Sequence, residues 1–167
     1  IEPETKIIAV VKANAYGHGL VEVARTAWAA GAEMLGVGTV DEGIALRQAK
    51  IRAPILVMGY AEPSDYHNVV EYMLQPTVFN KEEIIELGKV AAASHSPVRV
   101  HLKIDTGMHR LGINPDEIVA FVECIKKEPY LLLEAGCSHF AEVENHAYSV
   151  EQIKTLQAAL FGMQRAD

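Results

Sequence analysis

Lys12 is the residue whose position most clearly suggests covalent chemistry. It follows an apolar run, 7–11, that has the length of a buried strand. A lysine partly removed from water at a strand end holds more of the neutral amine that forms a Schiff base with a carbonyl compound. A lysine there can also simply extend to solvent. Gly17 and Gly19 permit a tight turn before a helix, whose N-terminus could face a phosphate.

A second group of polar residues lies in the segment 101–112. Arg110 offers a fixed fork of donors that suits an oxyanion such as a phenolate, and its alternative role is a surface ion pair with Asp105. Lys103 lies on the polar side of a strand-like run. The triplet Asp105-Thr106-Gly107 resembles that of aspartic proteases, but its βα context and the lack of a paired carboxylate exclude that reading.

A third candidate, His139, follows the last strand-like run in the segment Cys137-Ser138-His139-Phe140-Ala141. An isolated histidine in such a place is more often a packed core residue than a catalytic one. Three further polar residues follow closely, but they lack the strict ligand spacing of a metal site: Glu142, Glu144 and His146. We therefore expect a solvated loop there and no metal.

Apolar runs of strand length alternate with stretches of helical period, and these elements must position the candidate residues. The expected strands are 7–11, 34–37, 55–58, 74–79 (interrupted by Pro76), 98–105 and 131–139. The expected helices are 20–30 (apolar face Val21, Ala24, Ala27 and Trp28), 41–48, 63–72, one capped by Asn80, 115–127 and one after Ser149.

Six β-then-α units in a row predict an α/β fold with a parallel sheet and right-handed crossovers. An open doubly wound sheet and a (β/α)₈ barrel both begin in this way. The run 98–105 alternates apolar with polar residues, so one face of that strand is polar. Strands of doubly wound sheets are usually apolar on both faces, so the pattern favours a partial (β/α)₈ TIM-type barrel with about six of eight βα units.

Composition limits the classes of partner. The 167 residues are half apolar, enough to bury one core, and the net charge of −7 disfavours nucleic acid or an anionic membrane surface. Two cysteines 13 residues apart, with no CxxC, predict neither a disulfide scaffold nor a zinc site and fit a cytoplasmic protein. The sequence contains no membrane-length apolar run and no visible signal peptide.

Three motifs resemble those of the alanine racemase family. Residues 11–19, Val-Lys-Ala-Asn-Ala-Tyr-Gly-His-Gly, are similar to the family's cofactor-lysine motif almost letter for letter. The segments 103–112 and 138–141 resemble two further hallmarks, in family order and at similar spacing. The segments 40–47 and 54–60 also fit, so the resemblance covers almost the whole chain.

The resemblance implies a racemase that depends on pyridoxal phosphate and interconverts L- and D-alanine, which supplies D-alanine for peptidoglycan. It implies that Lys12 is the Schiff-base lysine and one of two bases, and that Tyr16 reaches the cofactor phosphate. Arg110 would bind the phenolic oxygen of the cofactor, and His139 would support the ring. Lys103 matches a lysine that is carbamylated in many members, and Asp105 belongs to the same supporting segment.

Departures and missing segments qualify this resemblance. His109 stands where the family often has Gly or Asn, and residues 142–148 are atypical. The family's second base, a tyrosine from a C-terminal β-domain of the partner subunit, has no counterpart here. The chain also begins without Met and ends directly after a helical pattern. We therefore expect residues 1–167 to be an incomplete barrel of a longer, homodimeric enzyme, inactive alone.

Alternatives remain within and outside this activity. A serine or serine/alanine racemase is the nearest one. A non-catalytic barrel that binds pyridoxal phosphate is disfavoured by the complete nine-residue lysine motif and by the segment 103–112. Decarboxylases of the same fold type share only Lys12-Ala13-Asn14, so the residues that follow separate this chain from them.

Overall fold

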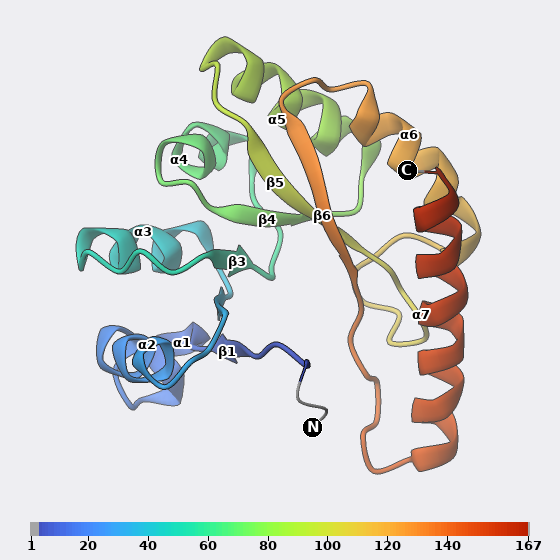
Figure 1. Cartoon of the computed structure of the whole chain (residues 1–167), viewed down its shortest axis with the longest axis horizontal. Coiled ribbons are helices and arrows are strands. Elements are labelled where there is room, and N and C mark those ends of the chain that lie inside the picture. The colour runs from blue at the N-terminus through green and yellow to red at the C-terminus, as the bar shows by residue number, and fades with distance from the viewer. Residues whose placement is uncertain (1–3, 167) are drawn as a thin grey trace. The chain divides into compact units, whose positions relative to one another are not determined.

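The structure is a computed structural model that describes residues 4–166, except the side chain of Ala166. Ile1–Pro3 and Asp167, the two chain ends that suggested truncation, lie outside the described residues. The chain divides into two compact units, unit 1 (Ile1–Thr77) and unit 2 (Val78–Asp167). Figure 1 labels the elements of each unit.

Unit 1 is a series of short parallel strands, each followed by a helix. The strands pair in chain order: β1 (Ile8–Val10), β2 (Met34–Val37), β3 (Ile55–Val57) and β4 (Gln75–Val78). The helices between them are α1 (Lys12–Tyr16), α2 (Leu20–Ala29), α3 (Val40–Gln48), η1 (Pro63–Asp65) and α4 (Tyr66–Glu71). β2 and β3 are almost entirely buried, as parallel strands covered on both faces must be.

Two details of unit 1 differ from the expectations. Trp28 does not belong to the apolar face of α2, because its side chain is 43% exposed and Ala24 is the only buried residue of that helix. Pro76 does not interrupt the fourth strand. It pairs with Val57 inside a continuous β4, because proline lacks only the N–H group and keeps its carbonyl acceptor.

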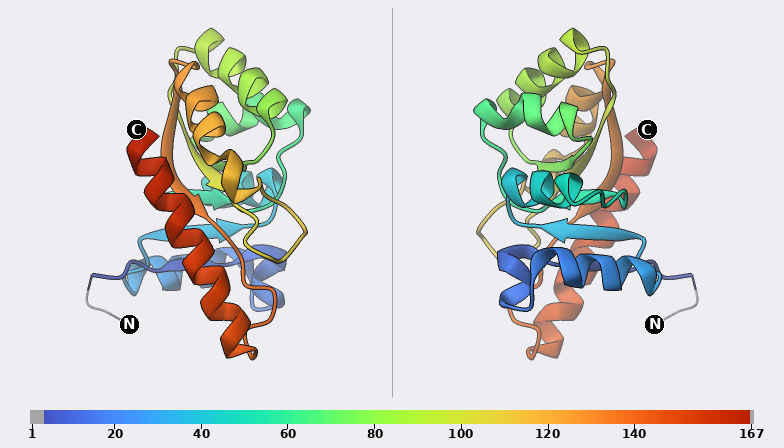
Figure 2. Two further views of the ribbon diagram at one scale, coloured as in Figure 1. Left: turned by 90° about the vertical axis from the view of Figure 1, so that its right-hand side faces the viewer. Right: turned by 90° about the vertical axis from the view of Figure 1, so that its left-hand side faces the viewer.

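Unit 2 contains the two longest strands and the longest helix. Its elements are α5 (Lys81–Ala93), β5 (Val98–Lys103), η2 (Pro115–Glu117), α6 (Ile118–Lys126), β6 (Leu131–Cys137) and α7 (His146–Ala166). β5 and β6 are parallel, with an irregular register between Val100 and His101. Helix α7 packs against α6 and β6 (Figure 2). None of the described helices is both long and apolar enough to cross a bilayer.

The alternation predicted for the fifth strand is present with one exception. Val100 and Leu102 are fully buried, whereas Arg99 is exposed. His101 lies on the polar face but is also buried, so this face is polar as predicted but only partly exposed to solvent. Burial lowers the pKa of His101, against the opposing effect of Glu134, so its imidazole is held neutral over a wider pH range.

Capping residues determine where the helices of unit 2 begin. Asn80 caps α5 as predicted, because its side chain accepts a hydrogen bond from the amide of Glu82 at 2.8 Å. The last helix begins at His146, whereas the sequence predicted that it begins after Ser149. Asn145 explains this difference, since its side chain accepts from the amide of Tyr148 at 3.2 Å.

Glu83, in the first turn of α5, gives a prediction on the pH dependence of stability. Its side chain is buried and accepts from the amide of Phe79, but among the described residues its Oε1 has no hydrogen-bond partner. Burial raises the pKa of Glu83 to about 7. The pKa of Glu83 is higher in the folded than in the unfolded chain. The contribution of Glu83 to the free energy of unfolding is therefore present at pH 4 and is lost as the pH rises through 7.

We expect Glu83→Gln to raise the free energy of unfolding at pH 8 by up to about 3 kcal/mol and to change it little at pH 4. Urea denaturation at both pH values measures this difference. Glu86→Gln, an exposed position on the same helix, is the control and leaves both values unchanged. An equal effect of Glu83→Gln at the two pH values would contradict the assignment.

Candidate active site

The segment after β1 forms a left-handed turn that fixes the neighbours of Lys12. Ala13, Asn14, Ala15 and Tyr16 all have φ between 50° and 53°, a conformation that costs about 1–2 kcal/mol per L-residue. Backbone hydrogen bonds hold the turn, including one from Ala15 to the carbonyl of Val11 at 2.9 Å and one from Gly19 to that of Asn14 at 3.1 Å. Strain held in this way is typical of functional sites.

Asn14 joins this turn to the helix that follows. Its Oδ1 accepts from the amide of Leu20, the first residue of α2, at 2.9 Å. Gly17 and Gly19 both have φ of 95°, so the glycine turn predicted before this helix is confirmed. Tyr16 extends into solvent with 66% of its surface exposed.

Glu42 fixes the position of the lysine segment within unit 1. Its Oε1 accepts from the amide of Ala13 at 2.6 Å, and its Oε2 accepts from the amide of Gly38 at 2.7 Å. Gly38 follows β2, and a Cβ there would lie 3.5 Å from the Cβ of Lys12. One carboxylate therefore ties the residue after Lys12 to the end of the neighbouring strand.

In unit 2, four predicted site residues line one small hollow at the ends of β5 and β6: Lys103, Asp105, Arg110 and His139. Arg110 and His139 are exposed and Lys103 is half-buried, and the hollow that they line has a volume of only about 10 Å³, roughly the room of one water molecule. The loop that carries Arg110 is held closed at its base. The amide of Ile113 donates to the carbonyl of Lys103 at 2.9 Å, and the amide of Asp105 donates to the carbonyl of Ile113 at 2.9 Å.

Asp105 is a loop-forming residue whose partner is His109. Its Oδ1 accepts from the amides of Gly107 (2.9 Å) and His109 (3.0 Å), and its Oδ2 lies 3.2 Å from Nδ1 of His109. Partial burial opposes ionisation, but these hydrogen bonds and His109 prevail and lower the pKa of Asp105. The alternative in which Asp105 pairs with Arg110 is wrong, because no ion pair joins them among residues 4–166.

His109 departs from the family pattern at a position whose backbone conformation explains why Gly or Asn is expected there. It has φ of 55°, a left-handed conformation that Gly and Asn adopt most readily. The ring contact with Asp105 offsets part of this cost.

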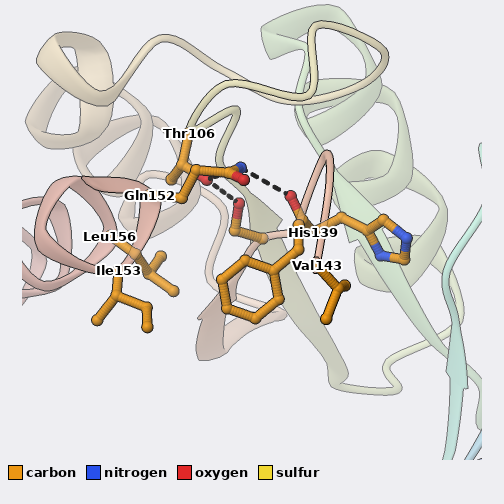
Figure 3. A pocket seen from close by; sticks show the side chains of 8 residues that line it. Thr106, His139, Val143, Gln152, Ile153 and Leu156 are labelled. Atoms are coloured by element: carbon orange, nitrogen blue, oxygen red, sulfur yellow. Dashed lines mark hydrogen bonds between the residues drawn. The ribbon is translucent and has the colours of Figure 1, made fainter. Parts of the chain in front are cut away.

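The ends of β5 and β6 are joined by a polar cluster in unit 2 (Figure 3). The hydroxyl groups of Thr106 and Ser138 lie 2.7 Å apart. Gln152 of α7 donates to Thr106 and to the carbonyl of His139, each at 3.1 Å. Beside this cluster is a cavity of about 230 Å³ whose other lining is largely apolar: Phe140, Val143, Ile153 and Leu156.

The structure groups the predicted residues by unit. Lys12 and Tyr16 belong to unit 1, and the hollow with Lys103, Arg110 and His139 belongs to unit 2. Glu142, Glu144 and His146, the first residue of α7, are all exposed. No group of three or more potential metal ligands converges anywhere in the described range, 4–166.

Sequence reasoning assigned no contact to Glu42 and did not consider Gln152 or Tyr148. Only one local signal pointed to any of them, the resemblance of the segment 40–47 that contains Glu42. Tyr148 donates from its hydroxyl to the carbonyl of Gly107 at 2.8 Å. Helix α7 therefore contacts the loop that carries Arg110 (residues 104–112, the arginine loop) as well as the end of β6.

A parallel series of βα units, with a half-buried lysine soon after its first strand, is typical of a (β/α)₈ barrel domain. The chain belongs to the alanine racemase N-terminal domain family, whose model matches residues 1–167.

Individual relatives agree with this family. Alanine racemase of Halothermothrix orenii is 38% identical over 162 residues, which are 96% of this chain and 43% of that protein. The alanine racemase of Bacillus anthracis with bound L-Ala-P superposes with a TM-score of 0.90 and 38% identity, over 99% of this chain and 43% of that one. Histidine racemase of Leuconostoc mesenteroides superposes with a TM-score of 0.85 and 31% identity, over 91% of this chain and 42% of that one.

These matches confirm the predicted fold class, a partial (β/α)₈ barrel with six βα units. The chain spans about two fifths of the length of the relatives it matches.

Proposed function

We propose that the protein carrying this chain is an alanine racemase dependent on pyridoxal phosphate, with Lys12 as the cofactor lysine. The observation that carries the proposal is the family match over all 167 residues, together with the strained turn that fixes the segment after Lys12. In this role the protein supplies D-alanine for peptidoglycan. We place it in the cytoplasm and propose that it is a homodimer. Residues 1–167 are then an incomplete barrel that lacks the C-terminal β-domain.

The residues present fit this cofactor by their donor chemistry. The amine of Lys12 has no hydrogen-bond partner among the described residues and is half-buried, so it is available to an aldehyde. The hydroxyl of Tyr16 is exposed and can donate to a phosphate. In unit 2, the guanidinium of Arg110 is suited to a phenolate, with His139 and Lys103 beside it. A carbamate on Lys103 would give Arg110 an anionic partner.

Bound pyridoxal phosphate supplies an electron sink that makes the α-proton of an amino acid acidic. Lys12 then has two tasks at its Nζ atom: it holds the cofactor, and it removes or returns the α-proton on one face of the substrate. Glu42 keeps the lysine segment in place, because its carboxylate accepts hydrogen bonds from the amides of Ala13 and Gly38. Proton transfer on the opposite face of the substrate needs a second acid–base group, which the family resemblance places outside residues 1–167, so this chain alone should not racemise efficiently.

An assay of D-alanine formation from L-alanine tests the proposal on the full-length protein. We expect activity that requires added pyridoxal phosphate and that residues 1–167 alone lack. Parallel assays with serine and histidine identify the preferred substrate. A folded full-length protein that binds the cofactor but interconverts no amino acid would favour the non-catalytic barrel instead.

A further inference from the structure

We propose that Gln152 is a positioning residue for the candidate site of unit 2, a role that rests on the proposed function. Gln152 lies in the second turn of α7 and is only 2% exposed, although its amide is strongly polar. It contacts the loops that follow both β5 and β6. Burying a polar group is unfavourable unless its hydrogen bonds are made, so the identity of this residue is constrained by its partners.

The hydrogen bonds of Gln152 allow only one orientation of its amide group. Oε1 accepts from the backbone N–H of Ala141 at 3.0 Å, and Nε2 donates to the carbonyl of His139 at 3.1 Å. Reversing the amide would set a donor against the N–H group and an acceptor against the carbonyl. Gln152 therefore holds the backbone on both sides of Phe140 by hydrogen bonds. In this way it restricts the direction in which the side chain of His139 points.

The third hydrogen bond ties the amide of Gln152 to the hydroxyl groups at the ends of β5 and β6. Nε2 also donates to Oγ1 of Thr106 at 3.1 Å, so that oxygen acts as the acceptor. The hydroxyl groups of Thr106 and Ser138 lie 2.7 Å apart, and either of them can be the donor. Ser138 lines the hollow together with Arg110 and His139. The buried amide thus connects α7 to a hydroxyl pair at the edge of the hollow.

The surroundings separate this role from simple packing. Figure 3 shows the ring of His139 directed away from Ile153 and Leu156, while Gln152 lies between the two loops. Apolar side chains line the neighbouring cavity, and α7 has further contacts with α6 and η2. Helix α7 therefore has docking contacts besides Gln152, and Gln152 adds hydrogen bonds to the backbone of residues 139–141.

The test uses the full-length protein with Gln152→Glu, which keeps the shape and the acceptor for Ala141 but removes both donated bonds. Gln157→Glu, an exposed position on the same helix, is the matched control. In the cofactor-free protein, we expect the NMR signal of the His139 ring to shift or split in Gln152→Glu alone. In the loaded enzyme, we expect kcat to fall about tenfold or more while KM changes less than threefold.

Gln152→Met keeps the inference testable if Gln152→Glu does not fold, since it has a similar shape and removes all three hydrogen bonds of the amide. It must produce the same change in the His139 signal. A folded Gln152→Glu protein with the wild-type signal and wild-type kcat would overturn the positioning role. A wild-type protein without racemase activity, in which Gln152→Glu still alters His139, would overturn the proposed function and leave the positioning role intact.

Discussion

Replacing Lys12 with alanine is expected to lower kcat/KM for alanine racemisation by at least about 10³-fold, because one side chain provides both the covalent attachment and one proton-transfer group. The side chain is half-buried, and the turn after it is held by Glu42 rather than by the lysine itself. The fold should therefore survive the substitution, as circular dichroism and thermal unfolding can verify.

Lys6→Ala is the matched control for this prediction. Lys6 is exposed just before β1, where it lies 4.0 Å from Glu33, so its loss should leave the rate within twofold of wild type. Steady-state assays in both directions, L- to D-alanine and the reverse, measure the effect. Retention of more than a tenth of the wild-type rate in Lys12→Ala would require another residue to hold the cofactor.

The second large effect is expected for Gly112→Ala, which should lower the free energy of unfolding by about 3 kcal/mol or more. Gly112 has φ of 134°, and a Cβ there would lie 2.5 Å from the amide nitrogen of Asp105. Backbone atoms cannot move aside as a flexible side chain can, so the base of the arginine loop must open. Binding of pyridoxal phosphate should weaken with it, because Arg110 is carried by this loop.

Gly31→Ala separates backbone strain from steric overlap. Gly31 has φ of 98°, but a Cβ there meets nothing within 4 Å, so only the strain of about 1 kcal/mol is expected. Chemical denaturation of both variants measures the difference, and cofactor titration measures its effect on the site. Equal losses of stability in the two variants would show that the close approach to Asp105 is not the cause.

Local patterns were sufficient to predict much of this chain. Strand 34–37, the cap at Asn80 and the alternation along β5 follow from residue types a few positions apart, and the structure confirms them. The same holds for the glycine turn after Lys12, since φ of 95° suits glycine. The start of α7 was misplaced because Asn145, which sets it, looked like one more polar residue of a loop.

The residues that position the site could not be predicted in this way. Glu42 contacts an amide 29 positions earlier, and Gln152 contacts a hydroxyl 46 positions earlier, so no local spacing reveals either partner. The left-handed conformation of Ala13 and Ala15 is also invisible in the sequence, because alanine has no intrinsic preference for it. Tertiary hydrogen bonds impose that conformation and override local propensity.

Pairing within the arginine loop illustrates the same limit at short range. Asp105 could pair with Arg110 or with His109 on charge alone. The turn at Gly107, with φ of 136°, brings the amide and the ring of His109 to the carboxylate instead. Arg110 is thereby left exposed and without an ion-pair partner among residues 4–166.

The central claim, that Lys12 holds pyridoxal phosphate, is tested most directly by reducing the loaded full-length protein with borohydride and mapping the modified peptide by mass spectrometry. We predict a single pyridoxyl adduct on Lys12, absent when Lys12 is replaced by alanine. An adduct on another lysine of a folded wild-type protein, or no adduct at saturating pyridoxal phosphate, would contradict the assignment.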